Sequence, residues 1–228
     1  MLVHVPNVLT KEQLHLIRHK LDQAAWADGK ATAGHQAAQV KHNLQLTPGS
    51  PLALELADIV SQALWANPVF LSCALPNRML TPLFNRYTGG GHYGNHVDSA
   101  LQNDPRPGGA GRIRSDVSTT VFLCDPDEYE GGELVVEDLY GAHEVKLPAG
   151  DAIVYPSDSL HRVEPVTRGA RLASFLWTQS LVREDARRSM LFNLDMNIIA
   201  LRQRLGDCEE TVALTSHYHN LLRMWSEV

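Results

Sequence analysis

A series of short strand-like runs in the second half of the chain constrains the fold more than any other feature. These runs are rich in β-branched and apolar residues and lie at 117–124, 133–136, 144–147, 152–155 and 169–177. Turn residues separate them, for example the pair Gly131-Gly132. Strands this short, with turn signals every several residues, are typical of an all-β sandwich or barrel. We therefore predict a mainly β fold whose core is a double-stranded β-helix, or jelly roll.

Helical patterns flank this β region on both sides. Apolar residues recur at helical spacing over 11–26, where Thr10 is a candidate cap, and again from Ser50-Pro51 up to Asn67-Pro68. Two more helices are expected at 180–205 and 209–225, after the last strand. The chain thus divides into three expected parts: an N-terminal strand and helix support at 1–76, the jelly-roll core at 77–178 and a helical appendage at 179–228.

Three N-terminal segments are predicted from composition and pattern alone. Residues 2–8 resemble a short strand, and the chain from 69 onward changes to strand-like runs. Residues 28–50 are small and polar with few apolar anchors, which suits either a mobile connection or a strand at the rim of a site.

Two ligand-type side chains, His96 and Asp98, lie two residues apart in an extended segment. Since side chains alternate along a strand, both should point to the same face. An exposed polar pair at a strand end is the alternative explanation. His161, in a later strand-like segment, is the natural third ligand. Two neutral imidazoles and one carboxylate on one face leave coordination positions open, as in non-haem Fe(II) oxygenases.

Arg171 lies ten residues after His161, in a run that reads as a mostly buried strand. An arginine that enters such a strand needs an anionic partner, because an unpaired buried charge is very costly. The carboxylate of a bound small molecule meets this need, because the guanidinium group can donate a hydrogen bond to each of its two oxygens. The sequence therefore predicts that Arg171 binds an anionic group, such as the carboxylate of a bound small molecule.

Together these motifs resemble the prolyl-4-hydroxylase-type branch of the Fe(II)/2-oxoglutarate dioxygenases. The motifs that carry the resemblance, in chain order, are Tyr87, His96-x-Asp98, Glu130-Gly-Gly-Glu-Leu134, Gly150-Asp-Ala-Ile-Val-Tyr-Pro-Ser, His161-x-Val-x-Pro-Val, Gly169-x-Arg171 and Trp177. The start Val5-Pro-Asn-Val-Leu-Thr10, the spacing from His161 to Arg171 and the extra C-terminal segment make the chain most similar to the bacterial PKHD-type hydroxylases.

The resemblance implies a reaction and a set of cofactors. Fe(II) would be held by His96, Asp98 and His161, and 2-oxoglutarate would chelate it while Arg171 pairs with the distal carboxylate. Tyr87 would donate a hydrogen bond to the same cosubstrate, with Tyr93 as the alternative. The implied reaction converts 2-oxoglutarate and O2 to succinate and CO2 and hydroxylates a substrate, with L-ascorbate as accessory reductant. Bacterial members are associated with iron uptake, so a siderophore-related or protein substrate is expected.

Two other functions use the same three ligands. A Zn(II) hydrolase or lyase would activate a water molecule on the metal, although that chemistry has no need of Arg171. A non-enzymatic cupin-like metal binder or iron sensor is the third alternative. Residues 99–116 follow Asp98 directly and carry Arg106, Arg112 and Arg114, which favours either a loop that faces an anionic or peptide substrate or an ordinary solvated loop.

Charge and composition limit the partners. The formal net charge of −6 argues against bulk attraction to nucleic acid. The N-terminus lacks the basic and apolar regions of a signal peptide, and no apolar run approaches the roughly 20 residues of a membrane helix. The 3 cysteines are widely spaced, which fits reduced thiols. We expect a cytoplasmic protein that acts on a small molecule or peptide, and the amphipathic C-terminal helices would suit a homodimer.

Overall fold

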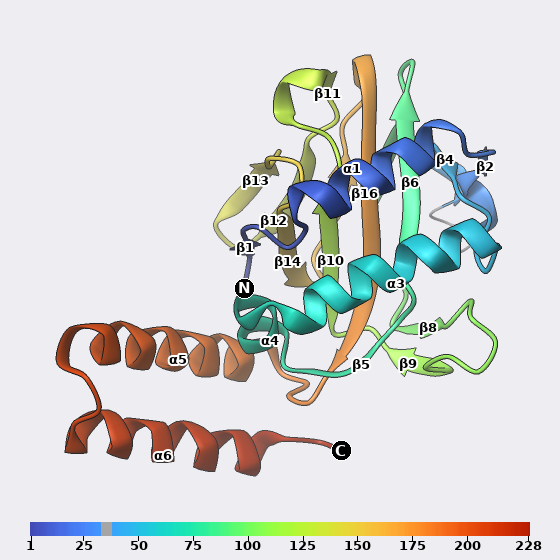
Figure 1. Cartoon of the computed structure of the whole chain (residues 1–228). Helices are drawn as coiled ribbons and strands as arrows, with labels where there is room; N and C mark the ends of the chain where they lie inside the picture. Colours follow the sequence, from blue (N-terminus) through green and yellow to red (C-terminus); the bar gives the residue numbers. More distant parts are fainter. Residues whose placement is uncertain (33–37) are drawn as a thin grey trace.

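The computed structural model describes residues 1–32 and 38–228. Within these residues the strands form two large sheets and a separate hairpin (Figure 1). The larger sheet runs in the order β1 (Val3–Val5), β14 (Ala152–Pro156), β10 (Val117–Phe122), β16 (Val166–Ser180), β6 (Leu83–Thr88), β4 (Leu44–Gln45) and β2 (Ala27–Asp28), with β5 (Pro76–Met79) and β11 (Tyr129–Gly131) also paired to β16. The smaller sheet runs β13 (Gly141–Val145), β12 (Leu134–Asp138), β15 (His161–Val163), β7 (His92–His96) and β3 (Lys41–His42). This architecture confirms the predicted jelly-roll core with flanking helices.

Helices α1 (Lys11–Asp22), α3 (Pro51–Ala66) and α4 (Pro68–Ala74) are N-terminal, and α1 and α3 lie across one face of the larger sheet (Figure 1). The predicted caps are present. Thr10 Oγ1 accepts from the Gln13 amide at 3.2 Å while Gln13 Oε1 accepts from the Thr10 amide at 2.9 Å, and Ser50 Oγ accepts from the Ala53 amide at 3.3 Å. The buried faces of these helices then join the main core through residues such as Ile17 and Leu56.

Several N-terminal boundaries differ from the prediction. The first strand covers only Val3–Val5, and α1 ends at Asp22 instead of continuing to 26. The expected strand-like run after 69 is wrong, because α4 occupies Pro68–Ala74. Asn67 Oδ1 accepts from the amides of Val69 at 3.0 Å and Phe70 at 3.1 Å, so the residue that ends α3 also caps the next helix.

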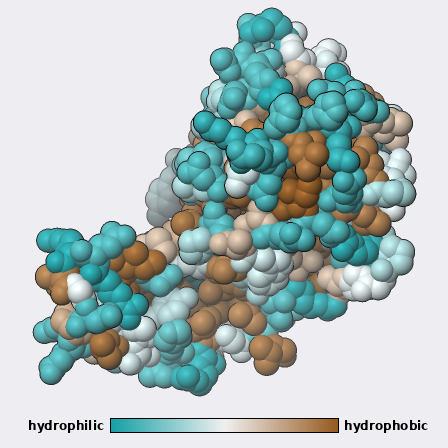
Figure 2. Space-filling view, in the orientation of Figure 1, coloured by the Kyte–Doolittle hydropathy of each residue, from teal (hydrophilic) through white to brown (hydrophobic). Residues whose placement is uncertain are grey.

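The C-terminal helices α5 (Asp185–Leu205) and α6 (Glu209–Trp225) form a pair that extends away from the sheets (Figure 1). The first begins at 185 and not at 180, because β16 continues in the sheet to Ser180. Apolar and hydrophilic side chains are interspersed on the surface of the pair (Figure 2). The exposed apolar side chains include Met190 and Leu205. The homodimer expected from these helices stays a prediction. Across the described part of the chain, none of the helices has the length and apolar character to span a membrane.

Candidate active site

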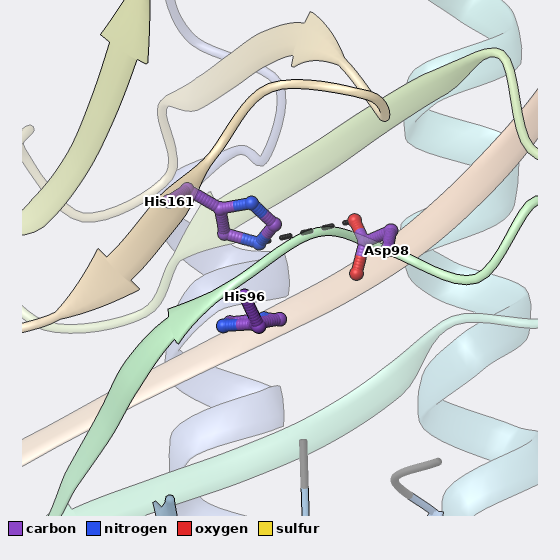
Figure 3. Close-up of side chains that lie close together, drawn as sticks. All are labelled: His96, Asp98 and His161. Atoms are coloured by element: carbon purple, nitrogen blue, oxygen red, sulfur yellow. Dashed lines mark ion pairs between the residues drawn. The ribbon is translucent and has the colours of Figure 1, made fainter. Parts of the chain in front are cut away.

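The three predicted ligands converge between neighbouring strands of the smaller sheet. His96 ends β7, and the register pairs it with His161 on β15, while Asp98 follows two residues beyond (Figure 3). One ligand atom from each side chain lies within 4.8 Å of those of the other two, and His161 Nε2 is 3.9 Å from Asp98 Oδ2. Two segments far apart in the sequence therefore meet at one point.

Backbone carbonyls fix the orientation of both imidazoles. His96 Nδ1 is 2.8 Å from the Gly94 carbonyl oxygen, and His161 Nδ1 is 3.0 Å from the Ser159 carbonyl oxygen. Since a carbonyl can only accept, Nδ1 carries the proton in each ring and Nε2 keeps its lone pair. Such an outer hydrogen bond is the usual support of a metal-binding histidine. Both histidines are therefore arranged to coordinate through Nε2.

One serine holds the carboxylate, and a second serine contacts the first. Ser118, on β10 of the larger sheet, donates its hydroxyl to Asp98 Oδ2 at 2.6 Å, and its Oγ is 2.8 Å from Ser157 Oγ. The sheets thus contribute different parts of the site, with ligands on the smaller one and support for Asp98 on the larger one. No pattern in the sequence marks either serine, because the contact depends on how the two sheets face each other.

The surroundings of His96 favour a neutral ring. Tyr93 stacks on it with the two ring centroids 3.6 Å apart, and the centroid of the His161 ring lies 4.2 Å from that of the His96 ring. Burial, and then the neighbouring His161, lower the pKa of His96 to about 4. Two neutral imidazoles and one carboxylate, open on the side of the pocket, are a donor set that suits Fe(II).

Arg171 occupies the inner part of the same pocket and is 1% exposed. Its guanidinium carbon lies 5.4 Å from the Tyr87 ring centroid and 5.3 Å from that of Phe122. Among the described residues no carboxylate forms an ion pair with it, and its buried Nε has no hydrogen-bond partner. A buried cation in this state requires an anionic ligand. The distal carboxylate of 2-oxoglutarate fits this requirement.

The two candidate tyrosines occupy different places. Tyr87 is 1% exposed and is the cross-strand partner of Arg171, whereas Tyr93 stacks on His96. Burial raises the pKa of both phenols, so both keep their protons and can donate a hydrogen bond. Tyr87 thus lies beside Arg171, and Tyr93 lies beside the candidate metal ligands.

The 99–116 segment is structured and contributes to the pocket in part. It forms the hairpin of β8 (Leu101–Asn103) and β9 (Arg112–Arg114), and Ser99 and Gln102 line the pocket. Two of its arginines bind acidic side chains outside the pocket: Arg106 bonds Asp58 at 2.6 Å, and Arg114 bonds Asp116 at 2.6 Å. Arg106 therefore ties the segment to α3, and Arg114 binds the residue that precedes β10.

A lysine that the sequence analysis did not single out also lines the pocket. Lys41 on β3 is 3% exposed, and burial lowers the pKa of its ammonium to about 8. The described part of 28–50 thus contains a strand at the rim of the site, which was one of the two expectations. Residues 33–37 lie outside the described residues.

Comparisons with known proteins agree with this geometry. Residues 82–179 match a family model described as the 2OG-Fe(II) oxygenase superfamily, and residues 185–227 match the PKHD-type hydroxylase C-terminal domain. A PKHD-type hydroxylase of Hyphomonas neptunium is 63% identical over 227 residues and covers 100% of both chains. A PKHD-type hydroxylase of Pseudomonas aeruginosa, PiuC, is 54% identical over 228 residues, again across 100% of both chains.

Solved structures share the fold at low sequence identity. A Trichoplax adhaerens prolyl hydroxylase, in complex with a hypoxia inducible factor peptide fragment, has a TM-score of 0.58 at 13% identity, over 83% of this chain and 86% of that one. HygX from Streptomyces hygroscopicus, with nickel, 2-oxoglutarate and hygromycin B bound, has a TM-score of 0.52 at 17% identity, over 80% and 84% of the two chains. At these identities the likeness concerns the fold alone.

Proposed function

Since this chain belongs to the PKHD-type hydroxylases and is a 2-oxoglutarate-dependent dioxygenase, we propose that it hydroxylates a C–H bond of a small-molecule or peptide substrate in the pocket between the sheets. The observation that carries the proposal is the convergence of His96, Asp98 and His161 beside the buried Arg171. A Zn(II) hydrolase would have no use for that arginine.

Each of the three ligand residues would have a defined role at the metal. His96 and His161 would hold Fe(II) through Nε2, and Asp98 would hold it through a carboxylate oxygen. When bound, Fe(II) and 2-oxoglutarate supply an O2-dependent oxidative decarboxylation that yields succinate and CO2 and places one oxygen atom on the substrate. The chain itself would orient the reaction partners, because residues of both sheets line the pocket.

Arg171 and Tyr87 would anchor the cosubstrate. The guanidinium pairs with the distal carboxylate of 2-oxoglutarate, and the phenol of Tyr87, beside it, donates a hydrogen bond to the same group. L-Ascorbate is included in the proposal as accessory reductant, on the strength of the family resemblance. We place the activity in the cytoplasm, where thiols such as those of the free cysteines Cys73, Cys124 and Cys208 stay reduced.

The first test is succinate formation from 2-oxoglutarate with Fe(II) and O2. Asp98→Ala removes the only anionic ligand of the triad, so turnover should fall to background together with bound iron. Asp127→Ala, at an exposed position, is the control and should behave as the wild type. Full turnover by Asp98→Ala at unchanged iron content would refute the ligand assignment.

The second test removes the proposed anchor of the cosubstrate. Arg171→Met should raise the 2-oxoglutarate concentration required for half-maximal succinate formation by about 30-fold or more, because it removes one partner of a buried charge pair. Arg168→Met is the matched control on the same strand, since Arg168 is exposed and binds Glu130 at 2.7 Å. Equal concentration dependence in both variants would exclude Arg171 from the cosubstrate site.

We extend the proposal to iron uptake or homeostasis on the family resemblance. The test compares metabolites of iron-limited cells with and without the protein. A compound that gains one oxygen atom only when the protein is present, and that binds or delivers iron, supports the extension. A product unrelated to iron would remove it and leave the dioxygenase activity intact.

A further inference from the structure

Tyr129 is a buried phenol that the proposed function does not use. It lies on β11 and is 1% exposed, and its Oη has no hydrogen-bond partner among the described residues. A hydroxyl buried in this way is costly, because it loses the water that it binds in the unfolded chain. Arg171 Nε is also buried and, among the same residues, without a partner. The core therefore contains a phenol oxygen that can accept a hydrogen bond and an N–H group that can donate one.

The turn after β11 brings these two side chains together. Gly132 has a positive φ, 70°, and a Cβ there would lie 3.1 Å from Tyr129 Cε2 and 3.2 Å from Arg171 Cδ. Both side chains thus pack against the same glycine. Tyr129 also pairs with Gly169 on β16, two residues before Arg171. Since residues two apart on a strand share a face, the strand pairing and the turn both place the phenol next to the arginine.

A lysine also holds the Tyr129 ring. Lys146 Nζ lies 4.1 Å from the ring centroid, a distance at which a ring face attracts a cation, and it donates to the Tyr129 carbonyl oxygen at 2.9 Å. Burial raises the pKa of the phenol, and the neighbouring Arg171 lowers it by a smaller amount. The phenol therefore keeps its proton and lies within the electrostatic reach of the guanidinium.

The orientation of the Arg171 guanidinium decides how it can bind a carboxylate. A guanidinium engages a carboxylate through two parallel N–H donors, either from both terminal nitrogens or from one terminal nitrogen and Nε. Among the described residues that line the pocket, Arg171 is present and Tyr129 is not, so a ligand in the pocket meets the arginine first. A phenol oxygen that accepts from Nε would leave both terminal nitrogens for the carboxylate and fix the plane of the guanidinium.

We propose that Tyr129 is a positioning residue for the cosubstrate: its Oη accepts a hydrogen bond from Arg171 Nε when 2-oxoglutarate binds, which directs both terminal nitrogens at the distal carboxylate. This inference rests on the proposed function and adds to it how the anchor of the cosubstrate is oriented. Gly132 takes part in this arrangement, because a side chain at that position would crowd both the phenol and the arginine.

The test measures the 2-oxoglutarate concentration that gives half-maximal succinate formation by the Fe(II)-loaded protein. Tyr129→Phe removes only the hydroxyl and should raise this concentration by about 10-fold, as expected for a lost hydrogen bond to a charged group. The rate at saturating 2-oxoglutarate should equal that of the wild type, because the metal ligands are untouched. Tyr140→Phe makes the same chemical change at a position that is 94% exposed, so it is the matched control and should behave as the wild type.

The double variant Arg171→Met/Tyr129→Phe separates a positioning role from a direct contact. If Tyr129 acts only through Arg171, the double variant should require no more 2-oxoglutarate than Arg171→Met alone, because the group that the hydroxyl orients is already missing. A further rise of about 10-fold in the double variant would overturn the inference, since the hydroxyl would then act independently of the arginine. An unchanged requirement in Tyr129→Phe, or a loss of rate at saturating 2-oxoglutarate without a change in the requirement, would overturn it as well.

The inference and the proposed function fail in different ways. If the proposed function is wrong, the wild type forms no succinate from 2-oxoglutarate, or Arg171→Met behaves like its control Arg168→Met. If only the role of Tyr129 is wrong, the wild type is active and Arg171→Met raises the 2-oxoglutarate requirement, whereas Tyr129→Phe does not.

Discussion

At the scale of single residues, the site depends on a hydroxyl that never touches the metal. Ser118 donates to Asp98 Oδ2 at 2.6 Å and keeps the carboxylate turned toward the histidines. Ser118→Ala should therefore weaken Fe(II) binding by about 10- to 100-fold, the usual effect of losing an outer hydrogen bond to a ligand. Anaerobic calorimetric titration with Fe(II) measures this change.

Ser174→Ala is the control for this prediction. Ser174 is also fully buried and donates to the Leu83 carbonyl at 3.1 Å, but it does not line the pocket. It should lose stability with little change in Fe(II) affinity. Equal Fe(II) affinities in the two serine variants would show that Ser118 does not orient Asp98.

The residue scale also shows what the sequence predicts and what it does not. His96, Asp98, His161 and Arg171 are recognisable because each breaks a local pattern, either as spaced ligand types or as a charge in a buried strand. Lys41 breaks no such pattern, because its segment is mostly polar and only the burial of Lys41 distinguishes it. That burial is created by the opposing sheet, so one chain segment alone cannot indicate it.

At the scale of elements, the Gly131-Gly132 pair shapes the turn between β11 and β12. Both residues have positive φ, 69° and 70°, and a Cβ at 131 would overlap the Pro165 carbonyl oxygen. Gly131→Ala should lower the free energy of unfolding by about 2 kcal/mol or more, since it adds a backbone clash to the cost of the left-handed conformation. Urea unfolding followed by circular dichroism provides the measurement.

Gly89→Ala separates these two contributions. Gly89 also has positive φ, 58°, but a Cβ there would meet nothing within 4 Å. This variant should lose only about 1 kcal/mol, the conformational cost alone. If Gly131→Ala loses no more than Gly89→Ala, the close approach of Pro165 does not constrain the turn.

Helix boundaries show why element prediction succeeds in one place and fails in another. Thr10 and Ser50 signal their helices through side chains that bond amides three residues ahead, and both starts are confirmed. Asn67-Pro68 carries two signals at once, since it ends α3 and caps α4, and only the first was predicted. Local patterns identify a cap well, but the packing of Phe70 and Cys73 in the core decides that the chain continues as helix.

At the scale of the whole molecule, Arg188 attaches the helical pair to the jelly roll. It is 2% exposed, and its guanidinium donates to the Asp116 carbonyl, just before β10 of the jelly roll, at 3.5 Å. It also donates to the carbonyls of Val182 at 2.8 Å and Arg183 at 2.6 Å, between β16 and α5. Arg188→Met removes the donor of the buried Val182 carbonyl and the contact with Asp116. The free energy of unfolding should fall by about 3 kcal/mol.

Arg187→Met is the neighbouring control, because the Arg187 side chain is 43% exposed and pairs with Glu184 at 3.0 Å. Its loss should stay at or below about 1 kcal/mol, as for a surface ion pair. Similar thermal unfolding curves for the two arginine variants would argue against Arg188 as an attachment point. The sequence predicted a helical appendage here but did not single out Arg188, since its contacts with Asp116 and Val182 depend on how the chain folds and not on the pattern of its own helix.

The central claim is that one ferrous ion is held jointly by two strands next to an anchored 2-oxo acid. Anaerobic addition of Fe(II) and then 2-oxoglutarate, followed by visible absorption, tests it most directly. The wild type should develop a weak charge-transfer band that requires both additions, and His161→Ala should lose it. A band of full intensity in His161→Ala, or none in a wild type that has bound iron and 2-oxoglutarate, would contradict the claim.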